Sequence, residues 1–493
     1  MQRLYGRDRS YRPANGGHGT PSRCRHKNSK GVLHYKACDS SIRLCGFVTF
    51  DVVESSKIPL WLVVPMALRL LLAVAAAAAL ALDMAGALGV NYGQVADNLP
   101  PPQDAAVLLR ALKATKVKLY DADARVLSAF AGSGVDFTVG VPDNLVPRMA
   151  SNPSAAAAWV RANIIPHLPG TPITTITVGN EVLTGTDTTM LRSLLPAMEA
   201  IHVALAACNI TSHIAVTTAH SLAVLSSSFP PSSSAFRHDL LPYITPLLAF
   251  LAKTNSPFLI NAYPYFAYKA DPGSVDLDYV LFQSNAGVLD AGTGLRYGNM
   301  LHAQVDAVRT AICAADYGRA VEIQVSETGW PSQGDADEPG ASPQNAAKYN
   351  GNLMKLVAQG KGTPGAPGES LQVYVFALFN ENQKPGPASE RHYGLFKPDG
   401  TPAYDVGVKA PTIGGGKGSD NDNGNGTNNG TGGGTGLVVA EGPGETGGGG
   451  ADPGTGFYTI SSATLKAKRW RCTAASSPLM SIIFLVVYGV CWL

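Results

Sequence analysis

The chain is 493 residues long, 45% of its residues are hydrophobic and 15% are charged, and its formal net charge at pH 7 is +2. This length and apolar content allow one large domain with appendages and a sizeable hydrophobic core. We expect no nucleic-acid partner, because no basic stripe runs along any of the expected helices or strands.

The N-terminal part contains a polar segment followed by a targeting signal. Residues 1–65 are mostly polar and show neither a helical nor a strand period, so we interpret them as a disordered leader or as an extension upstream of the true start. Met66 offers a simpler start, since Arg69, a long apolar run and the small-x-small triplet AGA follow it. We therefore expect residues 66–87 to be a secretory signal peptide that is cleaved at its C-terminal end, with an uncleaved membrane anchor as the alternative.

Residues 88–410 alternate between short β-type runs and helical patterns, and we expect them to form one domain. Apolar residues recur at three- and four-residue steps in three helical segments, residues 104–114, 190–208 and 301–315. Eight runs are expected to be strands, namely residues 88–93, 117–121, 137–142, 173–182, 213–220, 258–266, 322–332 and 371–382. Eight strands with helices between them predict an α/β fold, the (β/α)8 TIM barrel. The rival is an open doubly wound sheet, but no GxGxxG motif follows the first strand.

Two segments of different composition follow the expected barrel. Residues 411–460 are rich in Gly and Asn and cannot bury enough apolar surface to fold, so we expect a disordered linker. In residues 461–493, a basic cluster precedes the apolar run Leu479–Leu493, which is short for a membrane-spanning helix of about 20 residues. The basic cluster would lie on the lumenal side, against the positive-inside rule, so we expect a glycosylphosphatidylinositol (GPI) attachment signal whose attachment residue is left open. The protein should then reside outside the cell, at the plasma membrane and the cell wall.

Seven cysteines are present, but only Cys208 and Cys313 fall within the expected barrel. Their spacing matches no metal-binding motif, and we expect neither a metal nor a cofactor. A disulfide between the two cysteines and a pair of buried free thiols are both open interpretations. Asn209 begins a glycosylation sequon, which has meaning only if the chain is secreted.

Polar residues at the ends of the expected strands indicate the chemistry, because the active site of a (β/α)8 barrel lies at the C-terminal ends of its strands. Glu181 lies at the end of the fourth expected strand and Glu327 in the seventh, across the barrel mouth. Cleavage of a glycosidic bond needs a protonated carboxyl that gives a proton to the leaving oxygen. It also needs an ionised carboxylate that attacks the anomeric carbon or activates water. We expect the two carboxyls to approach to about 5–5.5 Å, the separation typical of retention.

Aromatic and amide side chains at the same strand ends are candidates for sugar binding, since aromatic rings stack on pyranose faces and amides bind hydroxyls. Asn180 precedes Glu181 and is expected to contact the sugar 2-hydroxyl, with a turn-stabilising Asn as the alternative. Four aromatic residues are expected either to contact glucose or to pack the rim of the barrel, namely Tyr92, Tyr263, Phe266 and Trp330.

Four motifs, in this order, resemble those of plant glycoside hydrolase family 17, the glucan endo-1,3-β-glucosidases. They are GVNYGQVADNLP at 89–100, VGNEV at 178–182, VSETGWPS at 325–332 and FNENQKPGPASERHYGLF at 379–396. The resemblance extends over residues 88–407, and the four motifs together are far more specific than any one of them alone.

The resemblance implies that Glu181 is the proton donor and that Glu327 is the nucleophile. It implies a substrate as well: internal β-1,3-glucosidic bonds of callose-type β-glucan, cleaved with retention by double displacement. Three charged residues of the last motif are expected to line the cleft or to support the catalytic pair, namely Glu381, Lys384 and Glu390. A structural salt bridge within this group is the alternative.

The residues leave two other functions open. A β-glucan transglycosylase would use the same nucleophile, and a non-catalytic β-glucan-binding protein of the cell wall would keep the barrel for recognition only. Gln324 departs from the family, whose strand is usually apolar at this position, and we expect no loss of activity from it. We expect the enzyme to be a monomer.

Overall fold

The computed structural model describes residues 88–407 with gaps at 212 and 319, together with residues 411 and 413. The expected leader, signal peptide and attachment signal lie outside the described residues, and so does the linker apart from the two residues just named. The expectations for these segments stay predictions.

Eight parallel strands close into a barrel, which confirms the predicted (β/α)8 fold. The strands are β1 (Leu88–Asn91), β2 (Lys116–Lys118), β3 (Asp136–Val141), β4 (Ile173–Asn180), β5 (Ala215–Ser221), β8 (Phe258–Asn261), β11 (Ile323–Thr328) and β12 (Val373–Val375). They are hydrogen-bonded in the closed order β1, β12, β11, β8, β5, β4, β3 and β2, and every neighbouring pair is parallel. The C-terminal ends of all eight strands therefore lie at the same end of the barrel.

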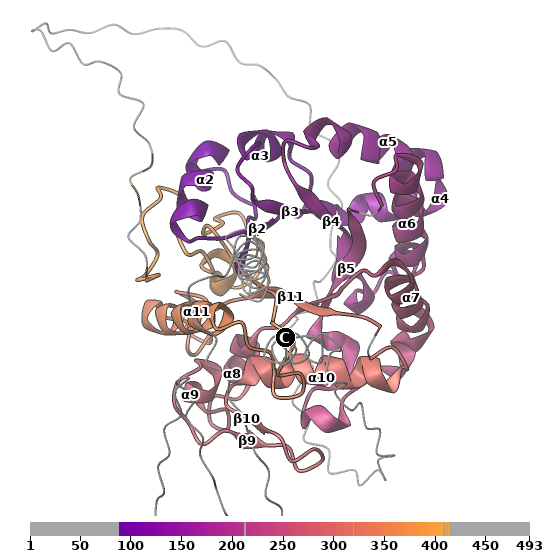
Figure 1. Ribbon diagram of the computed structural model, residues 1–493. Helices are drawn as coiled ribbons and strands as arrows, with labels where there is room; N and C mark the ends of the chain where they lie inside the picture. The colour runs from indigo at the N-terminus through magenta and orange to yellow at the C-terminus, as the bar shows by residue number, and fades with distance from the viewer. Residues whose placement is uncertain (1–87, 212, 319, 408–410, 412, 414–493) are drawn as a thin grey trace, which may run out of the picture. The chain divides into compact units, whose positions relative to one another are not determined.

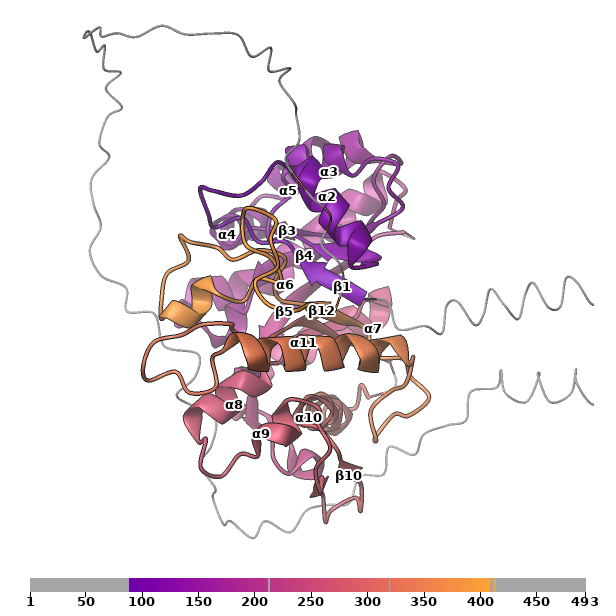
Figure 2. The same cartoon turned by 90° about the vertical axis from the view of Figure 1, so that its left-hand side faces the viewer.

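Helices surround the barrel, as Figure 1 and the turned view in Figure 2 show. They are α2 (Pro102–Ala111), α3 (Ala124–Ala129), α4 (Val146–Ser151), α5 (Pro153–Asn163), α6 (Thr188–Ala207), α7 (Leu241–Thr254), α10 (Met300–Ala314) and α11 (Pro343–Ala358). The three helices expected from periodicity are confirmed as α2, α6 and α10, with ends shifted by one to three residues. Side-chain caps explain two of the starts, because Asp187 accepts from the backbone of Thr189 and Met190, and Asn299 accepts from His302.

Two connections at the C-terminal end of the barrel carry additional short elements. These are β6 (Leu225–Ser227) and β7 (Ala235–Phe236) after β5, and α8 (Pro264–Ala270), α9 (Leu277–Val280), β9 (Val288–Leu289) and β10 (Arg296–Tyr297) after β8. Asp290 joins the two connections, because its carboxylate accepts from the N–H and the hydroxyl of Ser232 at 2.7 and 2.6 Å. Both connections belong to the face on which a barrel enzyme builds its site.

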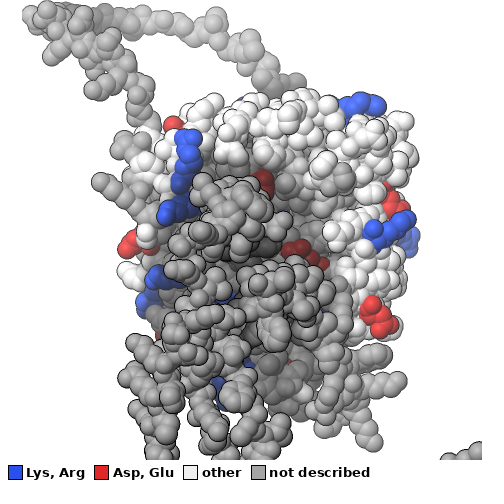
Figure 3. Space-filling model, in the orientation of Figure 1, with Lys and Arg blue, Asp and Glu red and all other residues white. Residues whose placement is uncertain are grey.

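Charged side chains are scattered over the part of the surface that Figure 3 leaves uncovered. Lys and Arg appear there as separate groups near the margin of the view, and acidic groups lie among them and closer to the middle. Most of the surface left uncovered in this view is uncharged.

The strand predicted over residues 258–266 is longer than the strand in the structure. β8 ends at Asn261, and α8 begins at Pro264, whose fixed φ suits the first turn of a helix and whose missing N–H is not needed there. The apolar run continues past the strand because the first turn of α8 is buried as well. Tyr263 and Phe266 therefore lie beyond the strand, at the start of α8.

The two cysteines of the barrel are not bonded to each other. Cys208 follows α6 and is a half-buried free thiol, so the interpretation as a Cys208–Cys313 disulfide is wrong. The neighbouring Asn209, which begins the sequon, is exposed and has a left-handed backbone with φ of +57°.

A buried carboxylate joins three segments at the rim of the barrel. Glu338 lies in the connection between β11 and α11, and its side chain is inaccessible to solvent. One oxygen accepts from the N–H groups of Asp335 and Ser389 at 3.0 and 2.9 Å. The other accepts from the Ser389 hydroxyl at 2.5 Å and pairs with Lys269 of α8 at 3.0 Å. Burial raises the pKa of Glu338, but these contacts outweigh it and lower the pKa to about 2.

We expect Glu338→Gln to lower the free energy of unfolding at pH 7 by about 2–3 kcal/mol, because the amide keeps the shape but loses the ion pair and one acceptor. Urea unfolding would measure the loss. The folded-state pKa is depressed, so the stabilisation is complete above the unfolded value of about 4.3 and is lost as the pH falls toward 2. The gap between wild type and variant should therefore shrink below about pH 4.

The exposed acid Glu322 at the opposite end of the barrel provides the control, and Glu322→Gln should leave stability nearly unchanged. An equal gap between wild type and Glu338→Gln at pH 3 and pH 7 would show that the charge of Glu338 is not what stabilises the rim.

Candidate active site

The tip of β4 bends sharply and carries the first candidate carboxylate. Gly179 and Glu181 both have a left-handed backbone, with φ of +67° and +56°, and they flank Asn180. The bend is held by two hydrogen bonds: the N–H of Asn180 donates to the Asp143 carboxylate at 2.8 Å, and the N–H of Glu181 donates to the carbonyl of Ala219 at 2.9 Å. The left-handed conformation costs Glu181 about 1–2 kcal/mol, a local strain that is common at functional sites.

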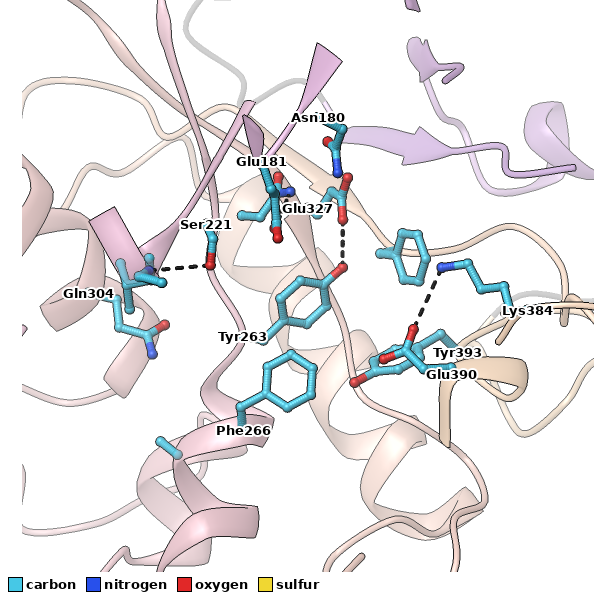
Figure 4. Close-up of a pocket in the computed structure, with 15 residues that line it drawn as sticks. Asn180, Glu181, Ser221, Tyr263, Phe266, Gln304, Glu327, Lys384, Glu390 and Tyr393 are labelled. Carbon is cyan, nitrogen blue, oxygen red and sulfur yellow. Dashed lines mark hydrogen bonds and ion pairs between the residues drawn. The ribbon is translucent and has the colours of Figure 1, made fainter. Parts of the chain in front are cut away.

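Irregular pairing directs both candidate carboxylates into the barrel mouth. The register of β4 against β5 shifts between Thr177 and Asn180, just before Glu181. The register of β11 against β8 shifts between Val325 and Glu327. Such bulges at a barrel rim re-aim side chains, and Figure 4 shows Glu181 and Glu327 facing the same pocket.

Glu327 is buried and is surrounded by hydrogen-bond donors. Lys118 at the end of β2 and the Tyr120 hydroxyl both contact its Oε1 at 2.7 Å, and the Tyr263 hydroxyl donates to its Oε2 at 3.0 Å. Burial alone would raise the pKa of Glu327, but the charge of Lys118 and the hydrogen bonds from Lys118 and Tyr120 outweigh it. The pKa of Glu327 therefore lies below its ordinary value, and the carboxylate is ionised at neutral pH.

Glu181 has the opposite environment. Its Oε1 accepts one hydrogen bond, from the Asn261 amide at 2.8 Å, and the Asn261 oxygen in turn accepts from the Ser326 hydroxyl at 2.7 Å. Burial, and after it the negative charge of Glu327, raises the pKa of Glu181 to about 7. Two carboxyls whose environments separate their pKa values in this way are suited to the roles of acid and nucleophile.

A cleft at the C-terminal end of the barrel collects most of the expected site residues (Figure 4). It is lined by Asn180, Glu181, Ser221, Leu222, Ala223, Asn261, Tyr263, Phe266, Ala267, Gln304, Glu327, Phe376, Lys384, Glu390 and Tyr393. The structure thus brings together seven of the ten residues named from the sequence, and it places Tyr92, Trp330 and Glu381 outside the lining.

Trp330 and Tyr92 pack the rim instead of lining the cleft. Trp330 is inaccessible to solvent, its indole N–H donates to the carbonyl of Gly340 at 2.8 Å, and its ring lies 5.1 Å from that of Tyr265. Tyr92 is 2% exposed and meets the ring of Phe379 edge-on at 5.8 Å. The packing alternative accounts for both residues, because the mouth of a closed barrel needs large side chains to fill it.

Of the three charged residues expected from the motif at 379–396, two line the cleft and one lies outside it. Glu381 is 2% exposed and accepts from the N–H of Val95 at 2.8 Å, so it holds the connection after β1 rather than the ligand. Lys384 and Glu390 line the cleft and form an ion pair at 3.7 Å, and the Lys384 ammonium lies 4.1 Å from the centre of the Phe376 ring. Burial raises the pKa values of Glu381 and Glu390, while Lys384 opposes both shifts.

The sequence reasoning missed the residues that set the charge of Glu327. Lys118 and Tyr120 lie two residues apart at the end of β2, so both point to the same face. A lysine inside a buried strand is itself a signal, since a buried charge needs a partner. Asn261 lies at the end of β8, and its hydrogen bond to Glu181 was not predicted from the sequence either. Within the described residues, no group of three or more His, Cys, Asp or Glu side chains is placed to hold a metal ion.

A (β/α)8 barrel whose mouth holds two carboxyls, one with a raised and one with a lowered pKa, has the features of a glycosidase-type site. Residues 88–408 match the model of "Glycosyl hydrolases family 17", and the chain belongs to this family.

Relatives of known name and a solved structure are similar over about two thirds of the chain. "Glucan endo-1,3-beta-glucosidase 11" of Arabidopsis thaliana is 54% identical over 322 residues, 65% of this chain and 75% of that protein. "Glucan endo-1,3-beta-glucosidase 10" of the same plant is 54% identical over 335 residues, 67% of this chain and 79% of that protein. The structure of CJP38, a β-1,3-glucanase and allergen of Cryptomeria japonica pollen, is 40% identical, with a TM-score of 0.63 over 65% of this chain and 99% of that one.

We expect Glu327→Gln to lower the pKa of Glu181 below its value of about 7, because the substitution removes the neighbouring negative charge and leaves the burial in place. The titration of the Glu181 carboxyl carbon by NMR would measure the shift, with Glu181→Gln used to assign the signal. Glu322→Gln is the matched control, since this exposed acid lies at the other end of β11, and it should leave the titration unchanged. An unaltered pKa in Glu327→Gln would mean that burial alone sets it.

Proposed function

We propose that the chain is a retaining glycoside hydrolase that cleaves internal β-1,3-glucosidic bonds of callose-type β-glucan. The observation that carries the proposal is the pair of buried carboxyls, one held ionised by Lys118 and the other with its pKa raised to about 7. Membership of family 17 and the names of the relatives support the substrate class.

In the proposed first step, the Glu327 carboxylate attacks the anomeric carbon and forms a covalent glycosyl-enzyme, while the bond to the leaving oxygen breaks. Glu181 gives its proton to that oxygen. In the second step Glu181, now ionised, takes a proton from water, and the resulting hydroxide oxygen attacks the same carbon and releases Glu327. The hydroxyl of Tyr263 holds Glu327 in place for attack.

Transfer to a second glucan is the alternative fate of the same glycosyl-enzyme. Product analysis on laminari-oligosaccharides of defined length separates the two outcomes, since products longer than the substrate arise only by transfer. If the main products are longer than the substrate, the enzyme is a transglycosylase rather than a hydrolase. If the chain binds the oligosaccharide but forms no product, it is a non-catalytic β-glucan-binding protein.

Replacing each carboxyl separately should distinguish the two roles. We expect Glu181→Ala to lower kcat/KM on natural glucan by about 10²–10⁴, the usual contribution of a general acid. It should affect an activated aryl β-laminarioside far less, because that leaving group needs no proton, and added azide should restore turnover with a β-azide product. Glu327→Ala should be nearly inactive on both substrates, and azide should give the α-azide.

Chromatography of the azide products and NMR of the first-released anomer provide the measurements. The opposite pairing of azide anomers would exchange the two roles. Initial release of the α-anomer by the wild-type enzyme would exclude retention.

We also propose that the enzyme is a secreted monomer held at the plasma membrane and cell wall by a GPI anchor. The support comes from the sequence pattern of residues 66–87 and 461–493, both of which lie outside the described residues. Phosphatidylinositol-specific phospholipase C should then release the enzyme from isolated membranes, with its apolar tail absent by mass spectrometry. Persistent membrane association with Leu493 still present would contradict the anchor.

A further inference from the structure

A glutamine from the outer helical layer reaches the cleft. Gln304 lies near the start of α10, whose first turn is fixed by the Asn299 cap, and Gln304 is 4% exposed. It lines the cleft together with Ser221 and Phe266, and Figure 4 shows its amide extending toward the Phe266 side of the pocket. No step of the proposed mechanism uses it.

The Gln304 amide is incompletely bonded. Its Oε1 is buried and has no hydrogen-bond donor among the described residues. A buried polar atom without a partner is costly, and native proteins keep few of them. Methionine would fill the same space without this cost, so packing of α10 does not explain the amide.

The neighbouring groups suit a neutral sugar. The hydroxyl of Ser221 accepts from the N–H of Ala223 at 3.3 Å, which leaves its own hydrogen to donate to a ligand. Phe266 adds an aromatic ring whose partner Tyr263 lies 5.3 Å away. A ring that can stack, a hydroxyl and an amide with a vacant acceptor are together the set that a pyranose with several hydroxyls requires.

We infer that Gln304, with Ser221 and Phe266, forms a glucosyl-binding subsite on the leaving-group side of the scissile bond. In Figure 4, Gln304 and Ser221 lie on the Glu181 side of the pocket, away from Lys384. Glu181 must contact the leaving oxygen in the proposed mechanism, so the sugar attached to that oxygen extends toward Gln304. The inference rests on the proposed function and adds to it a determinant of specificity for the departing glucan.

Gln304→Met tests the subsite with two substrates. On laminaripentaose, kcat/KM should fall about tenfold, because the departing sugar loses its hydrogen bond to the amide. On a dinitrophenyl β-laminaribioside the glycosylation rate should stay within about twofold, since the small aryl group does not extend to Gln304. The melting temperature should stay equal or rise, because an unpaired buried oxygen is removed.

The control is His302→Met on the same helix. His302 is also buried and also has an unpartnered nitrogen, Nε2, but it does not line the cleft. His302→Met should leave kcat/KM on both substrates unchanged. If Gln304→Met lowers the rates on both substrates equally, Gln304 acts on the catalytic pair or on the sugar at the other side of the scissile bond. If kcat/KM on laminaripentaose does not fall, Gln304 does not bind the departing sugar. Either result overturns the inference.

The wild-type enzyme tests the proposed function separately, by its cleavage of laminaripentaose. If no cleavage occurs, calorimetry of laminaripentaose binding to Glu327→Gln, with and without Gln304→Met, still decides the subsite. Affinity that falls with Gln304→Met supports the subsite, and equal affinity overturns it.

Discussion

The contact between Lys118 and Glu327, 2.7 Å long and almost fully buried, keeps a charged carboxylate inside the barrel mouth. Two buried charges are costly unless their geometry is good and their remaining atoms are hydrogen-bonded. Tyr120 and Tyr263 meet that condition by donating to both carboxylate oxygens. Burial raises the pKa of Glu181, and the charge of the ionised Glu327 raises it further. The ion pair thus contributes to the pKa values of both carboxyls.

Barrel closure makes this arrangement possible. β2 supplies Lys118, β4 supplies Glu181 and β11 supplies Glu327, and these strands lie far apart in the sequence but end at the same mouth. The pairing shifts at the ends of β4 and β11 direct the two glutamates inward. The contacts of Glu338 then fix the segment that carries Glu390 against the rest of the rim.

The sequence was sufficient to predict the barrel and to place Glu181 and Glu327 at its mouth, because strand and helix periods are local and the acidic motifs are specific. The sequence was not sufficient to predict a residue's role where that role depends on which side chains it contacts in the folded chain. Trp330 stands in a shared motif, yet its ring packs on Tyr265, and nothing in the motif distinguishes packing from binding. Lys118 could have been recognised as a charge in a buried strand, whereas Gln304 follows a helical period that predicts only burial.

Two kinds of buried polar side chain lie near the barrel mouth, some bonded to backbone N–H groups and some with an unpartnered oxygen. Below the cleft surface, Glu381 and Glu338 accept hydrogen bonds from backbone N–H groups, so their burial holds loops in place. In the cleft, Asn180 and Gln304 each keep a buried oxygen without a partner. Under the proposed function, hydroxyl groups of a bound glucan would supply donors for these two oxygens. The left-handed backbone of Glu181 adds a local strain at the same mouth, and such strain persists only where the surrounding contacts hold it, here the hydrogen bonds of Asn180 and Glu181 to Asp143 and Ala219.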